Sequence, residues 1–395
     1  MPRPIHLSLI GLICVSLASS QTIDPSLQDL INRNADFAAR LYRAVSSRTD
    51  DNVFLSTFTL STGLTALLGA TSGTTRDQLL QGLSLSGLDP ETLPDLFQNL
   101  RNQVLLGNQP MNLRQGVAVI PTMGFPVSSS YLDQVQTKFG GNTQNLAYTA
   151  PQEAADTINR YVQERTGDQI QELVSNLDPR TQMLLTTATS YDIRFSPSFN
   201  ASLTQDERFY VDKYHVVIVP MMFRADKFYL AYDRSLKVGV LKLPLADGGA
   251  MLVVLPDEEV DITGVEEEVN GEKIREWIRQ LKKTKLEVQL PRFLVEQSYT
   301  LRDSLQTLSI TQVFQDDAEI VNIGETKGPK LTQVYHKSIM SVDETIDGTN
   351  SGGRVTTFST LPPRLTINRP FLFVVYQESS GSVLLMGRVI DPTKK

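Results

Sequence analysis

Two histidines outside the first twenty residues, His215 and His336, are the side chains that could serve a hydrolase as a general base. A serine–histidine–aspartate site would place one of them beside an activated serine, but neither belongs to a Gly-X-Ser-X-Gly elbow or another nucleophile motif. We interpret both as strand residues without a catalytic role. The only cysteine is Cys14, and no Asp-X-Asp loop of the calcium type occurs, so no metal site is predicted. The residues predict a protein that is not an enzyme and needs no cofactor.

The first twenty residues have the pattern of a secretory signal peptide, and they contain Cys14. Arg3 gives a positive start, Leu7 to Leu17 form a short apolar run, and small residues precede Gln21. The run is too short to span a bilayer. We therefore expect a secreted, extracellular protein with no membrane span and with one domain at residues 21–395. Because no cysteine remains to form a disulfide, a large single core must hold that domain together.

Charge and surface motifs restrict the candidate partners. The chain has 37 Lys and Arg, and loss of Arg3 leaves 36 against 44 Asp and Glu, a formal charge of −8 that argues against nucleic acid as a partner. The densest basic cluster is interpreted as the solvated end of a helix and not as a polyanion site. It consists of Arg279, Lys282, Lys283 and Lys285. Asn200 begins the sequon Asn-Ala-Ser and is a predicted glycosylation site.

Hydrophobic periodicity predicts mainly helices in the first half of the chain and mainly strands in the second. The predicted helices are 27–45, 59–70, 76–83, 93–105, 151–166, 274–281 and 301–308. The predicted strands are 113–120, 184–191, 216–222, 228–231, 238–243, 250–255, 286–290, 365–376 and 383–389, with a further β-like run that ends at residue 342. No repeat of 20–50 residues is present. The order of elements indicates an α+β fold with large sheets.

The stretch from Ser341 to Phe371 stands apart from this pattern. About twenty residues rich in Thr, Ser, Gly, Asn and Asp separate a β-like run that ends at Val342 from another that begins at Leu365. A loop of this length inside a compact domain is usually a binding or regulatory segment, or it is disordered. We expect it to be the functional part of the molecule.

Motifs spread over the chain resemble those of the serpin family. The most specific is 365–375, LTINRPFLFVV, with the signature residues Asn368, Arg369, Pro370 and Phe371. The ending at 387–392, the NVFLS segment at 52–56, the LGA segment at 68–70 and the segment 158–170 match further family positions. The resemblance covers residues 25–395, and within the family it is greatest to the clade that contains antitrypsin.

The resemblance implies a serpin fold, with three β-sheets, eight to nine helices and an exposed reactive-centre loop at 344–364. In inhibitory serpins a protease cleaves this loop, and the amino-terminal part of the loop then inserts as a new strand into the main sheet and drags the acyl-enzyme with it. Family spacing from Pro362 implies a scissile bond between Ser359 and Thr360, with Phe358 as the alternative residue before the cut.

The hinge that begins the loop departs from the family pattern. Inhibitory members have small residues and several alanines here, whereas this chain has no alanine and carries polar residues and glycines. The hinge residues are Glu344, Gly348, Thr349, Asn350, Ser351, Gly352, Gly353 and Arg354. Gly, Asn and Asp are poor central-strand formers, and an unpaired polar group buried on insertion could cost several kcal/mol. Thr57 and Phe195 also replace residues that are usual in the family.

Two functions remain open at this stage. One is a secreted serpin whose loop is cleaved but whose trapping step is weakened or lost, as in a carrier or signalling protein. The other is a functional suicide-substrate inhibitor of a chymotrypsin-like or coagulation-type serine protease. Candidate partners are an extracellular serine protease and a protein cofactor, and we expect a monomer.

Overall fold

The computed structural model describes residues 23–107, 110–321, 328–344 and 361–395. The predicted signal peptide therefore lies outside the described residues. Nine α-helices occur in the described part: α1 Pro25–Ser46, α2 Thr57–Leu68, α3 Gly73–Gly82, α4 Leu93–Leu106, α5 Ser129–Phe139, α6 Pro151–Arg165, α7 Ile262–Glu268, α8 Gly271–Gln280 and α9 Arg302–Thr307. This number agrees with the expected eight to nine.

The strands fall into two hydrogen-bonded networks. They are β1 Val53–Leu55, β2 Leu113–Pro121, β3 Asn142–Thr143, β4 Met183–Asp192, β5 Gln205–Tyr210, β6 Val216–Asp233, β7 Val238–Pro244, β8 Gly249–Pro256, β9 Lys282–Pro291, β10 Phe293–Thr300, β11 Gln333–Val342, β12 Arg364–Thr366, β13 Phe371–Gln377 and β14 Val383–Val389. One network has five strands in the order β10-β11-β4-β2-β3. The other has nine, in the order β1-β14-β13-β8-β7-β6-β9-β12, with β5 on β6.

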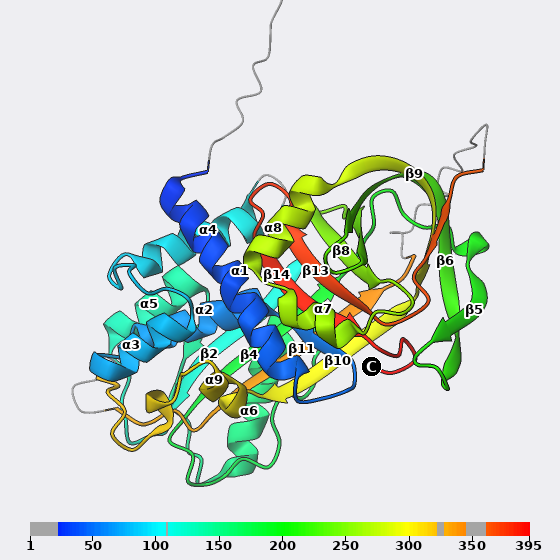
Figure 1. Ribbon diagram of the computed structural model, residues 1–395. Coiled ribbons are helices and arrows are strands. Elements are labelled where there is room, and N and C mark those ends of the chain that lie inside the picture. Colours follow the sequence, from blue (N-terminus) through cyan, green and yellow to red (C-terminus); the bar gives the residue numbers. More distant parts are fainter. Residues whose placement is uncertain (1–22, 108–109, 322–327, 345–360) are drawn as a thin grey trace, which may run out of the picture.

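The long strand β6 explains how three expected sheets become two networks. Its first residues pair with β5, its middle pairs with β9, and Tyr229–Asp233 pair with β7. One sector of the network therefore contains β5, β6, β9 and β12, and the other contains β7, β8, β13, β14 and β1. Figure 1 shows the first sector at the end of the molecule opposite α3 and α5. The predicted α+β class is confirmed.

Helix α2 lies between the two networks. All twelve of its residues are buried, and it contacts β2 and β4 of the five-stranded sheet and β14 of the other network. Helix α6 covers the opposite face of the five-stranded sheet, where Ile158 and Val162 pack with Leu184 and Ala188 of β4. The middle of the five-stranded sheet is therefore covered on both faces.

Several sequence predictions are corrected by the structure. The predicted strands 216–222 and 228–231 form one strand, because residues 223–227 between them keep the extended backbone and pair with β9. The predicted run 365–376 is two strands, because Pro370 has no N–H to continue the ladder. Helix α5 was not predicted, since only Tyr131, Val135 and Phe139 of its residues are buried. Strands β5 and β10 were also missed.

Candidate functional site

Strands β11 and β4 are hydrogen-bonded neighbours in the middle of the five-stranded sheet, so no gap for a further strand exists between them. The predicted loop begins just after β11 ends. β11 and β4 pair in parallel through nine residue pairs, from Gln333 and Leu184 to Ser341 and Asp192. In Figure 1 the two strands lie side by side behind α1. A strand inserted from the loop would have to enter between them and replace this whole ladder.

Glu344 is the one predicted hinge residue within the described part, and it is firmly held. Its side chain is 6% exposed. The Arg292 guanidinium donates two hydrogen bonds to its carboxylate, Nε to Oε2 and NH2 to Oε1, each at 2.9 Å. The Thr204 hydroxyl donates a third. The other hinge residues, Gly348 to Arg354, and the scissile-bond residues Phe358, Ser359 and Thr360 lie outside the described residues.

The far end of the loop is attached to strand β9. Residues Arg364–Thr366 pair with β9 in parallel, and Arg364 Nε donates to Glu287 Oε2 at 2.8 Å. The 85% exposed Leu361 precedes this strand. The chain therefore leaves the five-stranded sheet after Val342 and joins the other network at Arg364.

The four signature residues connect the two sectors of the nine-stranded network. The Asn368 carbonyl accepts from Tyr210 N at 2.8 Å, and Arg369 Nε donates to the Pro256 carbonyl at 2.8 Å. Pro370 begins the change of direction into β13, and the ring of Phe371 packs edge-on against Phe293 with 5.8 Å between centroids. These contacts support the fold.

The side chain of His336 on β11 links the two central strands through a hydrogen bond to β4. It is fully buried, and burial lowers its pKa to about 3, so the ring is neutral at physiological pH. Nε2 accepts from Ser56 N at 3.1 Å, which leaves the Nδ1 proton to bind Thr187 Oγ1 at 2.9 Å. His336 lies on β11 and Thr187 lies on β4, so this bond crosses the line along which the sheet would open.

A chain of hydroxyl groups extends this contact into α2. Ser56 Oγ and Thr59 Oγ1 are 2.8 Å apart, and Thr59 Oγ1 is 2.8 Å from Thr189 Oγ1 on β4 and 2.9 Å from Gln115 Oε1 on β2. All these groups are buried. The network fixes both central strands to the amino-terminal end of α2. Sequence reasoning missed it, since its members are spread over nearly three hundred residues of the chain.

The interpretation of both histidines as strand residues holds for His336 and is wrong for His215. His215 lies in the turn before β6, where its exposed ring binds the Asp212 carboxylate at 2.6 Å. The turn forms because the short Asp212 side chain also accepts from the backbone N–H groups of Tyr214 and His215.

Acid should destabilise the protein through His336. The pKa of this residue is about 3 in the folded state and about 6.5 in an unfolded chain. Between these two pKa values the unfolded state therefore binds more protons than the folded state. As the pH is lowered from about 6 to 3, His336 should reduce the free energy of unfolding by ~1.4 kcal/mol per pH unit. Urea titrations at several pH values should show a shallower slope for His336→Gln. A slope for His336→Gln equal to that of the unchanged protein would contradict the assignment.

The two substitutions near the sheet are accommodated in the closed structure. Phe195 is 6% exposed and packs edge-on against Phe199, with 5.2 Å between ring centroids. The Thr57 hydroxyl donates to the Leu384 carbonyl at 3.3 Å. Phe195 therefore has a packing partner and Thr57 a hydrogen-bond partner in the closed structure.

Among the described residues, no three His, Cys, Asp or Glu side chains gather as a metal site would need. No helix in the described part is long and apolar enough to cross a membrane.

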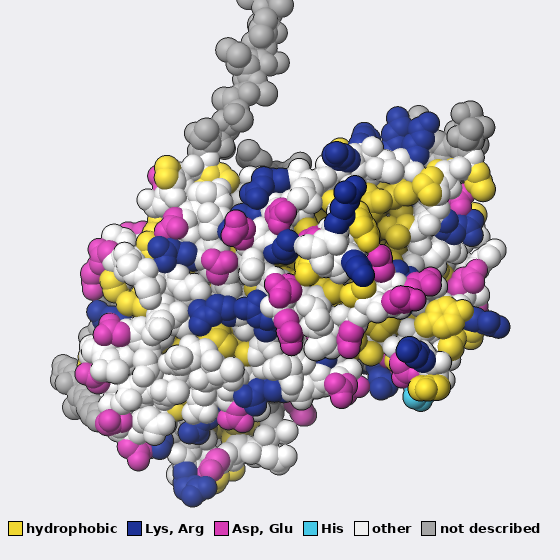
Figure 2. Space-filling view, in the orientation of Figure 1, with side chains coloured by type: hydrophobic (Ala, Val, Ile, Leu, Met, Phe, Trp, Pro, Cys, Tyr) yellow, Lys and Arg dark blue, Asp and Glu magenta, His cyan; other side chains and the backbone are white. Residues whose placement is uncertain are grey.

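The predicted basic cluster is exposed, but its lysines lie on β9 and only Arg279 lies on helix α8, which corrects the helix-end interpretation. In Figure 2, dark blue side chains border an apolar area over the region of α8, β8 and β9.

Comparisons with known proteins identify relatives of the whole molecule. The family model described as "Serpin (serine protease inhibitor)" matches residues 32–392. Human protein Z-dependent protease inhibitor is 29% identical over 374 residues, which cover 93% of this chain and 84% of that protein. Plasma serine protease inhibitor from Bos taurus is 30% identical over 385 residues, or 94% of this chain and 93% of that protein.

Solved structures give the same result. The crystal structure of mouse protein Z-dependent protease inhibitor has a TM-score of 0.86 and 28% identity, covering 93% of this chain and 98% of that one. Thyroxine-binding globulin in complex with thyroxine has a TM-score of 0.85 and 25% identity, covering 92% and 99%. Within the predicted clade, the segments at 211–222, 240–244 and 250–255 favour the protein Z-dependent inhibitor, in agreement with these relatives. The chain belongs to the serpin family of serine protease inhibitors.

Proposed function

We propose that this protein is a secreted serpin whose reactive-centre loop is cut by an extracellular serine protease, and whose trapping step is weakened or lost. The observation that carries the proposal is the closed pairing of β11 with β4, set against a hinge that contains no alanine. Insertion must open that pairing and must place the hinge residues within it.

The cost of opening has several parts. Nine parallel residue pairs separate, the buried bond between His336 and Thr187 breaks, and the chain beyond Glu344 turns back along β11. The ladder is recovered if the inserted strand pairs with both neighbours. The recovery depends on what that strand brings into the sheet.

Insertion would bring the polar side chains of the hinge between β11 and β4, where the sheet is covered on both faces. α2 packs on one face of β4, and on the other face α6 packs on β4 while Tyr335 and Ile339 of β11 contact the same cluster. Whichever way the strand alternates, some of Asp347, Asn350 and Arg354 face a covered side. An unpaired polar group buried in this way costs roughly 1–3 kcal/mol or more. Gly352 and Gly353 add the loss of backbone freedom, about 0.5–1 kcal/mol each relative to alanine.

The remaining assignments follow the family spacing. We propose one serpin domain at residues 21–395, a reactive-centre loop at 344–364 and a scissile bond after Ser359, with Phe358 as the alternative. A protein that is consumed by cleavage in this way is not an enzyme. We propose that it needs no small-molecule or metal cofactor. We further propose that it is a monomer whose partners are an extracellular protease and a protein cofactor.

Incubation with chymotrypsin or an elastase tests this proposal. We expect cleavage near Phe358 and Ser359, release of active protease, and a stoichiometry far above one serpin per protease inhibited. Denaturing gels should show cleaved serpin without a higher-mass band, and mass spectrometry of the products should give the bond. A denaturant-resistant complex at near-equimolar stoichiometry would contradict weakened trapping.

The second candidate is a functional suicide-substrate inhibitor of a chymotrypsin-like or coagulation-type protease. The length of the loop favours it, because residues 345–358 supply fourteen residues for a pairing of nine. The names of the relatives also favour it, since two of them are described as protease inhibitors. The gel experiment separates the two candidates directly.

Secretion is proposed from the leader and from the sequon. The Asn200 Oδ1 atom accepts from Ser202 N at 3.0 Å and from the Ser202 hydroxyl at 2.8 Å in a surface turn next to the 3₁₀ helix Ala201–Leu203. Expression of the full chain in cultured animal cells should release protein that begins at Gln21 and loses mass on treatment with an N-glycosidase. Asn200→Gln should abolish that mass change, and retention of the protein inside the cells would contradict secretion.

A further inference from the structure

Arg224 on β6 is a buried cation with few partners. Its side chain is 7% exposed, and its guanidinium lies over the rings of Phe199 at 5.1 Å and Phe228 at 4.5 Å. NH1 donates to the Pro197 carbonyl. Nε has no hydrogen-bond partner, and the nearest carboxylate, that of Asp226, is 3.9 Å away. A buried charge usually has a closer ion pair than this one with Asp226.

Arg224 lines a pocket of about 260 Å³ at the edge of the nine-stranded network. The other lining residues are Pro197, Asp226, Lys227, Phe228, Tyr229, Pro244 and Lys283. With Arg224, three of the lining residues are cationic and one is acidic, so the pocket carries an excess of two positive charges. The prolines and rings supply apolar walls, and Lys283 Nζ lies 5.9 Å from the centre of the Tyr229 ring.

We propose that this pocket binds a small organic carboxylate that carries an aromatic ring. The carboxylate would lie between Arg224 and the exposed ammonium groups of Lys227 and Lys283, where it balances the excess charge. The ring would pack against Tyr229 and the prolines. Nothing in the proposed inhibitor function uses these residues.

The size of the pocket sets the size of the ligand. A dry cavity of ~150 Å³ accommodates benzene, so 260 Å³ suits one or two fused rings with a short acidic side chain. Burial lowers the pKa of Arg224 to about 10, while Asp226 opposes this shift. The guanidinium therefore remains charged at neutral pH, and a second anion beside it is favoured.

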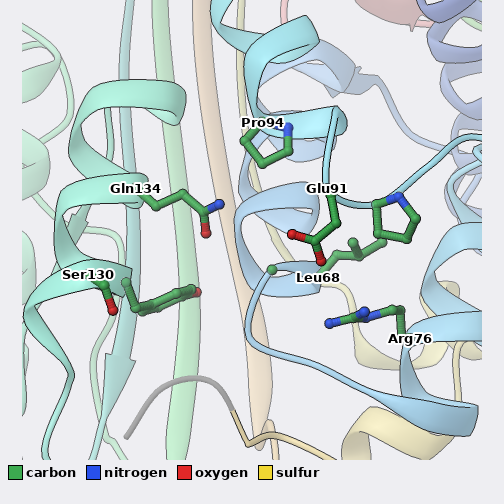
Figure 3. Close-up of a pocket in the computed structure, with 9 residues that line it drawn as sticks. Leu68, Arg76, Glu91, Pro94, Ser130 and Gln134 are labelled. Carbon is green, nitrogen blue, oxygen red and sulfur yellow. The ribbon is translucent and has the colours of Figure 1, made fainter.

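The other pocket of about 260 Å³ is a weaker candidate. It lies among α2, α3, α4 and α5, where Figure 3 shows Gln134 pointing from α5 towards Pro94 and Glu91. Its cation, Arg76, already donates to the Thr71 carbonyl at 2.7 Å, and Glu91 in the lining balances the charge. No buried unpaired group of this pocket calls for a ligand.

Isothermal titration of the intact protein with indole-3-acetate at low salt tests the proposal. The neutral analogue indole-3-acetamide has the same shape and serves as the matched ligand. We expect a dissociation constant on the order of 0.1–1 mM for the acid, in line with a ligand of this size, and at least tenfold weaker binding of the amide. Equal binding of acid and amide, or no binding of the acid at several millimolar, would overturn the proposal.

Variants locate the site. Arg224→Gln should weaken binding of the acid at least tenfold, and Lys283→Gln should weaken it about two- to fivefold. Lys282→Gln is the matched control, since this lysine is the exposed neighbour that does not line the pocket, and it should bind as the unchanged protein does. If Arg224→Gln does not fold, the Lys227→Gln and Lys283→Gln pair decides the question. Unchanged affinity in that pair, or in folded Arg224→Gln, would place the ligand elsewhere.

Discussion

Cleavage of the reactive loop should raise the melting temperature by only a few degrees, and alanine substitutions in the hinge should turn this into a rise of tens of degrees. The substitutions are Asn350→Ala, Ser351→Ala, Gly352→Ala and Gly353→Ala in one variant. Small side chains fit between two covered faces, and alanine loses less backbone entropy than glycine on entering a strand. Insertion then gains two ladders of hydrogen bonds without burying an unpaired amide. Scanning calorimetry before and after limited chymotrypsin cleavage measures both effects.

A matched control separates the hinge from the loop as a whole. Thr356→Ala with Thr357→Ala changes the composition of the same loop close to the predicted scissile bond, beyond the hinge. This variant should keep the small temperature shift of the unchanged protein. If the unchanged protein already gains tens of degrees on cleavage, insertion works with the polar hinge, and the second candidate function gains its support.

The hinge variant should also alter the encounter with the protease. Faster insertion competes better with hydrolysis of the acyl-enzyme, so the number of serpin molecules consumed per protease should fall towards one. Temperature shift and stoichiometry should change together, because both depend on the same strand entering between β11 and β4. A temperature shift without trapping would mean that insertion has become favourable but stays too slow.

Sequence alone predicted those elements whose apolar pattern is regular. The spacing of Leu30, Ile31, Phe37 and Leu41 predicted helix α1 to within two residues at each end, because all four face one core. Strand β6 was predicted as two pieces, since half of its length borders solvent and carries charges such as Asp226 and Lys227. A local pattern reports burial, and burial along the middle of β6 depends on its pairing with β9, which lies about fifty residues further along the chain.

The signature motif and the loop composition predict where the reactive loop begins and ends, but they predict none of the contacts that the structure shows at those ends. The ion pair of Glu344 with Arg292 spans 52 residues, and the bond of His336 with Thr187 spans 149. In neither pair does the sequence around one residue indicate which distant residue is its partner. Glu266 begins a run of three glutamates, yet it is 3% exposed because α7 lies against the core.

Loss of the buried ion pair between Arg388 and Glu266 should have the largest effect on stability. Both side chains are 5% exposed, and Arg388 NH1 lies 3.0 Å and 2.8 Å from the two carboxylate oxygens. Its other nitrogens donate to carbonyls at and beyond the end of α1, among them that of Asp51 at 3.1 Å. The Tyr42 hydroxyl donates to the same carboxylate. One guanidinium thus joins α1, α7 and β14.

Arg388→Met should therefore lower the free energy of unfolding by about 3–5 kcal/mol, because Glu266 would stay buried without its cation and several carbonyls would lose their donor. Urea denaturation at pH 7 measures the loss. The exposed pair of Lys394 with Asp51, at 3.4 Å, is the matched control, and Lys394→Met should change stability by less than about 1 kcal/mol. Adding Glu266→Gln to Arg388→Met should recover part of the loss, since the unpaired charge is then removed. Additive losses in the double variant would show that the two side chains stabilise the fold independently and not as a pair.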